Sequence, residues 1–482
     1  MFNVPLLIGG QARPASNGKT FERCNPVSGV VVSQVAAATV EDADAAVAAA
    51  KDAFPAWAAL PPSERRARLL RAAELMTERA AEFVATKGET GAMANWYAHN
   101  VFLAANVLRE AASMVTQIQG DVIPSDVPGS FAMAIRQPCG VILGIAPWNA
   151  PVILATRAIA MPLACGNTVV LKSSEISPAV HHLIGQVLQD SGLGDGVVNV
   201  ISNAPEDASK IVERLIANPA VRRVNFTGST HVGRIIGELS ARHLKPALLE
   251  LGGKAPLVVL ADADLEAAVE AAAFGAYFNQ GQICMSTEKL IVDESVADRF
   301  VEMLTVKVQT LHAGDPEDEN SVLGSLVDSA AARRIQGMVG QAIELGANLI
   351  CGGKVEGSIM QPVLLDGVTS AMQLYREESF GPVAVVIRGS GDEELIRLAN
   401  DSAFGLSAAI FSRDTSRALA LAQQIESGIC HINGPTVHDE PQMPFGGVKA
   451  SGYGSFGGKA SIDQFTQLRW VTIQHGNRAY PI

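Results

Sequence analysis

Between residues 140 and 230 the chain alternates short β-branched, apolar runs with longer stretches of helical composition, and this alternation constrains the fold most. The runs expected to form buried strands are Val141–Ala146, Thr168–Leu171, Val197–Ile201 and Arg223–Phe226. The stretches expected to form helices between them are Pro151–Leu163, Pro178–Ser191 and Ala204–Ile216. Strands joined through helices lie parallel. The sequence therefore predicts an α/β fold built from βαβ units.

A second α/β unit is expected after residue 253. Its strands are predicted at Pro256–Leu260, Lys289–Val292, Ala384–Ile387 and Ala408–Phe411. Because 482 residues are too many for one hydrophobic core, two or three domains are expected. We place a boundary near residues 252 and 253, which puts a cleft between the units, and such clefts commonly bind ligands.

Composition excludes several classes of function. Apolar residues make up 48% of the chain and charged residues 18%, as in an ordered globular protein. A net charge of −12 with interspersed signs disfavours nucleic acid and anionic membrane as partners. No signal peptide, membrane-length apolar run or zinc-ligand spacing is visible, so a cytoplasmic protein without a metal site is expected.

One cysteine differs from the other five in its setting. Cys284 lies among small and polar residues just after the helix-like run Leu265–Phe278, and Glu250 ends a short apolar strand 34 residues earlier. A reactive thiol needs partial exposure and an electropositive or dipolar setting. A carboxylate in a partly apolar cleft has a raised pKa and can act as a base near neutrality. The other cysteines are expected to be small hydrophobes: Cys24, Cys139, Cys165, Cys351 and Cys430.

Four segments together resemble the NAD(P)-dependent aldehyde dehydrogenase superfamily, and the resemblance runs nearly end to end. They are PWNAP at 147–151, LELGGK at 249–254, NQGQICMS at 279–286 and NGPTVHDEP at 433–441. The resemblance implies a Rossmann-like NAD domain, an α/β catalytic domain and a small β oligomerisation element. The corresponding residues are 1–121 with 139–251, then 252–447, then 122–138 with 468–482, while 448–467 is a linker on the cofactor side. A homodimer or homotetramer is the implied assembly.

The resemblance also implies the chemistry. Cys284 would attack the aldehyde carbon to give a thiohemiacetal, which loses hydride to NAD and becomes a thioester. Glu250 would activate the water that hydrolyses this thioester. The side-chain amide of Asn149 would stabilise the oxyanion beside the backbone N–H of Cys284. Many family members use a further Glu as a proton relay, but ungapped counting places Phe456 there, so proton release must take another route.

Two glycine-rich segments compete for the cofactor. GYGSFG at 452–457 fits the dinucleotide pattern literally, but no buried strand precedes it and no acid follows about 20 residues later, so we reject it. FTGSTHVG at 226–233 follows a predicted strand and opens a predicted helix, whose N-terminus favours pyrophosphate. The residues that the resemblance assigns to NAD are Ile145, Pro147, Trp148, Lys172, Ser174, Glu175, Phe226, Gly228, Ser229, Thr230, Val232, Gly233, Leu251, Glu378 and Phe380.

The substrate is expected to be an aromatic aldehyde, because the quoted segments most resemble the branch acting on salicylaldehyde, benzaldehyde and vanillin. Ala150 leaves room for a ring where many relatives carry a bulky aromatic residue. Arg157 could form a salt bridge or face the substrate. The expected pocket residues are Trp96, Ala150, Arg157, Ile283, Met285 and Phe445. The alternatives are an aliphatic aldehyde or semialdehyde dehydrogenase, a CoA-acylating dehydrogenase, a cofactor-independent Cys hydrolase and a crystallin-like relative without activity. The last is disfavoured because Cys284, Glu250 and Asn149 are all present.

Overall fold

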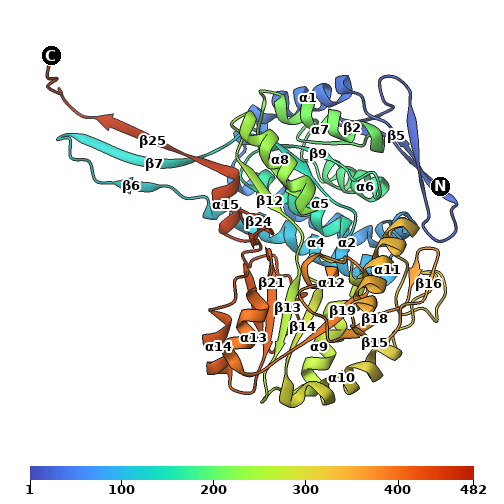
Figure 1. Cartoon of the computed structure of the whole chain (residues 1–482). Helices are drawn as coiled ribbons and strands as arrows, with labels where there is room; N and C mark the ends of the chain where they lie inside the picture. The colour runs from blue at the N-terminus through green and yellow to red at the C-terminus, as the bar shows by residue number, and fades with distance from the viewer.

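The computed structural model describes residues 1–482 and consists of two α/β units and a projecting β arm (Figure 1). The α/β fold expected from the sequence is confirmed. None of its helices is both long enough and apolar enough to cross a membrane.

The first unit is built on an eight-stranded sheet in the order β24-β12-β11-β8-β9-β10-β2-β3. Its central strands, from β12 to β10, run parallel. Their bounds are β8 (Val141–Ile145), β9 (Thr168–Lys172), β10 (Val198–Ile201), β11 (Val221–Thr227) and β12 (Ala247–Glu250). At the edges, β2 (Leu6–Ile8) pairs antiparallel with β10 and with β3 (Gln11–Arg13), and β24 (Gly452–Tyr453) pairs antiparallel with β12.

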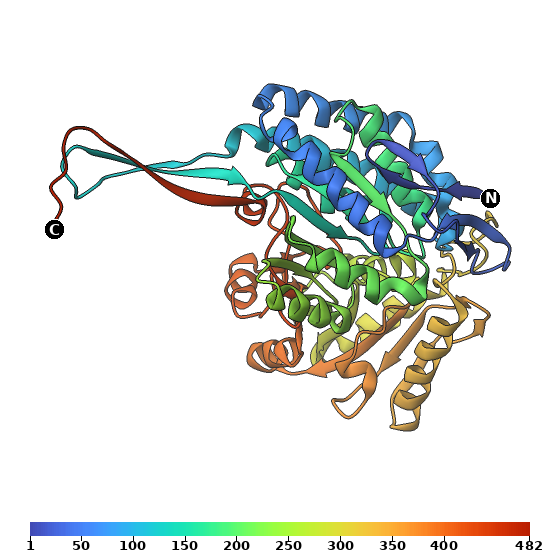
Figure 2. The ribbon, with the colours of Figure 1, turned by 90° about the horizontal axis from the view of Figure 1, so that it is seen from above.

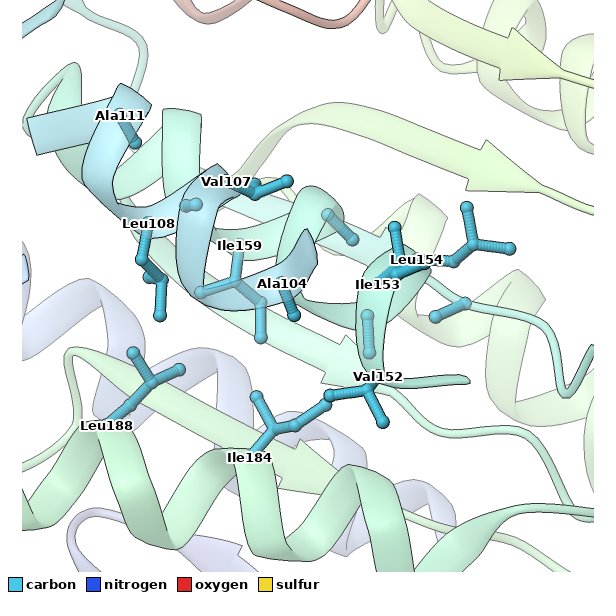
Figure 3. Close-up of a cluster of buried hydrophobic side chains, with 14 of the residues drawn as sticks. Ala104, Val107, Leu108, Ala111, Val152, Ile153, Leu154, Ile159, Ile184 and Leu188 are labelled. Carbon is cyan, nitrogen blue, oxygen red and sulfur yellow. The ribbon is translucent and has the colours of Figure 1, made fainter. Parts of the chain in front are cut away.

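Helices cover both faces of this sheet. Alternate strand residues such as Val141 and Leu143 pack with α1 (Val40–Ala58), α7 (Ala208–Ala217) and α8 (Thr230–Arg242). Their neighbours such as Ile142 pack with α2 (Pro62–Glu78), α4 (Ala94–Met114), α5 (Pro151–Ala164) and α6 (Pro178–Asp190). Figure 3 shows part of this second layer, where side chains of α4, α5 and α6 meet. The helix expected from residue 204 begins only at Ala208, because Pro205–Asp207 forms a 3₁₀ turn first.

The second unit holds a seven-stranded sheet in the order β15-β18-β19-β14-β13-β21-β22. All its pairs are parallel except that of β15 with β18. The bounds are β13 (Ala255–Val259), β14 (Thr287–Asp293), β15 (Asn348–Cys351), β18 (Val363–Asp366), β19 (Val383–Gly389), β21 (Ser407–Phe411) and β22 (Ile429–Ile432). One face packs on α9 (Leu265–Tyr277) and α10 (Glu294–Gln309), the other on α11 (Ser329–Glu344), α12 (Gln373–Arg376), α13 (Gly391–Asn400) and α14 (Thr415–Ala422).

The arm is a three-stranded antiparallel sheet that extends away from both units, with the C-terminus at its tip (Figure 2). It consists of β6 (Asp121–Ile123), β7 (Ser130–Pro138) and β25 (Thr466–Gln474), the last preceded by α15 (Ala460–Phe465). Strand β25 pairs with β7 along its whole length, from Thr466 opposite Pro138 to Gln474 opposite Ser130. A smaller sheet of β1 (Phe2–Val4), β5 (Val31–Ala36) and β4 (Thr20–Cys24) lies near the N-terminus.

The chain passes from the first sheet to the second between Glu250 and Ala255. The parallel register aligns the carboxyl ends of the first sheet, because Ile145 pairs with Lys172 and with Phe226, and Thr227 pairs with Glu250. In open α/β sheets, ligands bind beyond these carboxyl ends. Several residues that the sequence analysis expected to be functional, such as Lys172 and Glu250, are the last residues of strands at this edge.

Candidate active site

Cys284 follows a sharp reversal of the chain at the end of α9. Asn279, Gln280 and Gly281 adopt left-handed backbone angles, with φ of 48°, 56° and 67°. A side chain at Gly281 would collide with the carbonyl of Gly381, so this turn needs glycine. A side chain at Gly253 would likewise collide with the carbonyl oxygen of Cys284. The segment after Glu250 therefore lies directly against the cysteine, which is itself half-buried.

Glu250 is a buried carboxyl group without a partner. It is 1% exposed, and neither carboxyl oxygen accepts a hydrogen bond. Burial raises the pKa of Glu250 to about 8, and the positive charge of Arg157 opposes that rise only in part. A carboxyl group in this state is protonated below neutrality and becomes a base in the mildly alkaline range.

The charge around Cys284 differs from what we expected for a reactive thiol. Burial raises the pKa of Cys284 well above its ordinary value, and the negative charges of Glu250 and Glu378 raise it further. Arg157 is the group that opposes them. The thiol is therefore protonated at neutral pH in this structure, so that attack on a carbonyl requires a base to remove its proton.

Asn149 lies between the end of β8 and the start of α5 and is held from both sides. Its backbone carbonyl oxygen accepts hydrogen bonds from Trp96 Nε1 at 2.9 Å and from Asn279 Nδ2 at 3.1 Å. Its own Nδ2 donates to the carbonyl of Gln282 at 3.0 Å. That contact uses one of the two N–H groups on the amide, so the other can donate to an oxyanion beside Cys284.

Two cavities, each of about 320 Å³, meet at Asn149, Leu154 and Cys284. We call the first the cofactor-side cavity; its other lining residues are Pro147, Trp148, Thr227, Gly228, Ser229, Glu250, Leu251, Gly252, Arg334, Glu378 and Phe380. We call the second the substrate-side cavity; its other lining residues are Trp96, His99, Leu103, Ala150, Ile153, Arg157, Phe274, Ile283, Met285, Pro435, Val437, His438, Asp439 and Phe445. A molecule in either cavity can therefore reach the same thiol.

Seven of the fifteen residues expected to bind NAD lie on the wall of the cofactor-side cavity: Pro147, Trp148, Gly228, Ser229, Leu251, Glu378 and Phe380. Ile145, Lys172 and Phe226 lie at or near the ends of β8, β9 and β11, on the same edge of the sheet. Ser174 and Glu175 follow β9, while Thr230, Val232 and Gly233 form the first turn of α8. The structure thus brings these residues to one edge of the first sheet, except for Glu378 and Phe380, which face that edge from the loop before β19 of the second unit.

The start of α8 is shaped for close approach of a ligand. Ser229 caps the helix by accepting a hydrogen bond from the backbone N–H of Val232 at 3.3 Å. A side chain at Gly233 would collide with Leu251, and one at Gly228 would collide with the ring of Phe226. The helix N-terminus therefore lies close to the sheet edge, where its free N–H groups favour an anion such as a pyrophosphate. The rejected segment 452–457 instead supplies β24, an edge strand beside Glu250.

A buried ion pair that we did not anticipate supports the far wall of the cofactor-side cavity. Lys254 pairs with Glu288, whose carboxylate accepts hydrogen bonds from the backbone N–H groups of Ser379 and Phe380. Phe380 has a φ of 49°, which is strained for a bulky residue. The carboxylate of Glu378 accepts a hydrogen bond from the N–H of Gly253 at 2.9 Å.

Arg334 from α11 also lines this cavity and donates to the carbonyl of Ser379. Like Lys254 and Glu288, it was not singled out in the sequence, because no short motif links α11 and β14 to the loop before β19. Only the folded arrangement of the second sheet places these three side chains behind Glu378 and Phe380.

All six residues expected to form a substrate pocket lie on the wall of the substrate-side cavity. Ala150, Ile153, Leu154 and Arg157 come from one face of the start of α5, since their spacing follows the helical repeat. The residues that sequence reasoning missed are Ile153 and Leu154 of α5 and others from α4, from α9 and from the loop at 435–439. That loop was quoted for its resemblance, but no spacing rule assigns its side chains to a cavity.

Comparison with known proteins shows the family of the chain. The aldehyde dehydrogenase family model matches residues 13–471. The chain is 78% identical over 482 residues to a vanillin dehydrogenase of Pseudomonas fluorescens, covering 100% of both proteins. The chain belongs to the aldehyde dehydrogenase family. It is an aldehyde-oxidising oxidoreductase, and the α/β architecture expected from the sequence is that of the family.

Two further similarities concern relatives of this aldehyde dehydrogenase named for salicylaldehyde. The chain is 50% identical over 478 residues to a salicylaldehyde dehydrogenase of Pseudomonas putida, covering 99% of each. It also superposes on the crystal structure of a salicylaldehyde dehydrogenase from Pseudomonas putida G7 complexed with salicylaldehyde, with a TM-score of 0.98, 49% identity and full coverage of both chains.

Arg157 of this aldehyde dehydrogenase combines the two alternatives that the sequence left open, a salt bridge and a position facing the substrate-side cavity. It forms a salt bridge with Asp439, and both side chains are nearly buried at 7% and 12% exposure. Its guanidinium also lies 4.5 Å from the centre of the Phe445 ring and 6.0 Å from that of Phe456. Arg157 therefore lines the substrate-side cavity while its charge is balanced, and Phe456 packs against it.

Proposed function

We propose that this enzyme oxidises aromatic aldehydes to carboxylates with NAD⁺ and water. The observation that carries the proposal is the substrate-side cavity, which Cys284 shares with three aromatic side chains, Trp96, Phe274 and Phe445, and where the small side chain of Ala150 leaves room in the wall. Flat apolar walls of this kind favour an aromatic ring over a flexible alkyl chain. The names of the relatives, vanillin and salicylaldehyde dehydrogenases, support the same substrate class.

In the proposed reaction the thiol of Cys284 gives its proton to ionised Glu250, which passes it to solvent. The sulfur bonds to the aldehyde carbon, and the carbonyl oxygen becomes an oxyanion beside the amide of Asn149. A bound nicotinamide supplies the acceptor for the hydride that leaves this carbon, and a thioester on Cys284 results. Glu250 then removes a proton from a water molecule, whose oxygen attacks the thioester carbon. The carbon–sulfur bond breaks, which releases the carboxylate and restores the thiol.

We also propose NAD⁺ rather than NADP⁺ as the preferred cofactor. The glycine-lined start of α8 and the aligned strand ends fit a dinucleotide, and Lys172 and Glu175 would hold the adenosine ribose. Glu175 Oε1 pairs with Lys172 and accepts a hydrogen bond from Asn203 Nδ2 at 3.0 Å, so the carboxylate is fixed in place. A 2′-phosphate beside it would meet a like charge, which disfavours NADP⁺. We therefore expect a higher kcat/KM for NAD⁺, and equal values would contradict this choice.

The arm is proposed to join subunits in a homodimer or homotetramer. It exposes large apolar side chains, with Trp470 at 77%, Val122 at 71% and Leu468 at 59% exposure. Exposed apolar surface of this kind marks interaction sites. Light scattering after size-exclusion chromatography should give a multiple of the 50.5 kDa chain, and a stable monomer would contradict the proposal.

The substrate class is tested with a panel of aldehydes at saturating NAD⁺, in which the absorbance of reduced cofactor is followed. Benzaldehyde and salicylaldehyde should have higher kcat/KM values than acetaldehyde and hexanal. An enzyme that turns over the short aliphatic aldehydes faster than either aromatic one contradicts the aromatic assignment. Oxidation without added CoA and only with cofactor excludes the acylating and hydrolase alternatives.

A further inference from the structure

The substrate-side cavity contains one polar side chain that the proposed reaction does not use and that makes no hydrogen bond within the protein. His99 lies on α4, on the same face as Trp96 and Leu103, which also line the cavity. Among the other polar lining groups, Asn149 and Cys284 have roles in the reaction, Arg157 pairs with Asp439, and His438 Nε2 bonds to Glu440 at 2.9 Å. Neither nitrogen of His99 has such a partner.

Packing fixes the ring of His99 in place. It stacks on Trp96, with ring centres 5.9 Å apart and planes 25° apart, and the edge of Phe278 lies against it at 6.1 Å. Trp96 is in turn held by its hydrogen bond to the carbonyl of Asn149. A polar group held in one orientation with unused donors and acceptors is suited to recognise a ligand, because little conformational entropy is lost on binding.

The position of His99 in the cavity specifies what it can reach. Cys284 and Asn149 lie at the inner end, where the neighbouring wall residues Ile283 and Ala150 are buried at 4% and 7% exposure. His99 is exposed, so it lies at the mouth. An aromatic aldehyde with its carbonyl carbon on Cys284 points its para substituent directly away from that inner end. A group at the ortho position would instead stay beside the inner walls.

We propose that His99 recognises a hydroxyl group para to the aldehyde, so that 4-hydroxybenzaldehydes are the preferred substrates of this site. The inference rests on the proposed oxidation of aromatic aldehydes and adds the ring position that the enzyme distinguishes. It agrees with the name of the 78% identical relative, a vanillin dehydrogenase, because vanillin carries its hydroxyl group para to the aldehyde.

The ionisation of the ring suits this role. Although His99 reaches solvent at the mouth, desolvation of its ring by neighbouring groups lowers its pKa below the ordinary value, against the opposing charge of Asp439. The imidazole is therefore neutral at pH 7, with one nitrogen that donates and one that accepts. It can accept from a phenol O–H or donate to a phenolate. A para carbonyl makes the phenol more acidic by delocalising its charge, so both forms are relevant.

The test compares two substrates of similar shape, 4-hydroxybenzaldehyde and 4-methylbenzaldehyde, in the wild-type enzyme and in His99→Phe. Phenylalanine keeps the stacking on Trp96 but removes both nitrogens. The ratio of kcat/KM for the hydroxy over the methyl substrate should fall about tenfold, the effect of one lost hydrogen bond. The change should appear in KM, because the contact is remote from the reacting carbon and is equal in ground and transition states.

Three variants complete the experiment. His99→Gln, which keeps a donor and an acceptor, should restore part of the ratio. His438→Phe tests the other histidine of the same cavity, and His312→Phe, an exposed residue outside both cavities, controls for loss of a histidine. An unchanged ratio in His99→Phe, including an equal loss for both substrates, overturns the proposal, as does a selective loss in His438→Phe alone. Failure of the wild type to oxidise either substrate would instead contradict the proposed function itself.

Discussion

The cofactor-side cavity is walled largely by strand ends and the start of one helix, whereas the substrate-side cavity is walled by side chains from α4, α5, α9 and the loop at 435–439. The first depends on glycines that allow main chain to approach, as at Gly228 and Gly233. The second depends on aromatic and aliphatic surfaces that segments far apart in the sequence bring together. The comparison teaches that a bound dinucleotide requires fixed backbone geometry, while the choice of aldehyde can change through single side chains.

Replacing Cys284 removes the thiol that lies where the two cavities meet, and this change should have the largest effect on activity. Cys284→Ala should lower aldehyde oxidation by about 10⁴-fold or more, because no other group there can bond to the carbonyl carbon. Calorimetry should still detect NAD⁺ binding, since the glycine-lined wall is unchanged. Cys351→Ala, a half-buried thiol outside both cavities, is the matched control. Residual turnover near the wild-type rate in Cys284→Ala would assign the chemistry elsewhere.

Glu250 lines the cofactor-side cavity, but its proposed role is the hydrolysis of the thioester that Cys284 forms with the substrate. Glu250→Gln keeps the shape and removes the base, so one burst of reduced cofactor should precede a steady state slower by about 10² to 10⁴-fold. Rapid mixing with absorbance detection measures both phases. Glu344→Gln, an exposed acid at the end of α11, should behave as wild type. Wild-type steady-state turnover in Glu250→Gln would exclude this carboxylate as the base for deacylation.

Ala150 tests the substrate side alone. Ala150→Phe should crowd an aromatic ring and leave space for a narrow chain, so the ratio of kcat/KM for benzaldehyde over hexanal should fall by about ten- to a hundredfold. NAD⁺ affinity should stay within twofold, because Ala150 does not line the cofactor-side cavity. A matched loss for both aldehydes would mean that the variant damages the site rather than its selectivity.

The raised pKa of Glu250 predicts how the rate depends on pH. The base must be ionised, and burial holds its pKa at about 8, so deacylation should rise about tenfold per pH unit below 8 and level off above it. Single-turnover decay of the thioester across pH 6 to 10 measures this limb. A pH-independent rate between 6 and 8 would show that the carboxyl group is already ionised and would weaken its assignment.

Glu175 should give the smallest effect, and it tests the cofactor side alone. Glu175→Ala removes the like charge that opposes a 2′-phosphate, so the preference for NAD⁺ over NADP⁺ should narrow by about tenfold. The order of aldehydes in the substrate panel should not change. A shift in that order would show that the two cavities are coupled more strongly than their separate walls suggest.

The sequence predicted the fold and the local motifs better than it predicted the cavity walls, which segments distant in the sequence form together. Alternating apolar runs gave the two parallel sheets because strand and helix periodicity is local. Glu250 and Cys284 stood out because each lies in a short diagnostic segment. His99 and Asp439 did not, since their positions depend on how α4 and the loop at 435–439 pack against α5. The pKa of Cys284 was also not foreseeable, because it depends on burial and on carboxylates brought close by folding.

The pairing of β25 with β7 has a consequence for synthesis on the ribosome. Ser130 is translated long before Gln474, the residue opposite it, and β12 likewise precedes its edge partner β24. A nascent chain therefore carries an open edge at β12 until residue 453 emerges and another at β7 until residue 474 emerges, and open edges are prone to pair with other chains. Ribosome-bound chains that end before residue 452 should thus depend on chaperones more than the finished protein does.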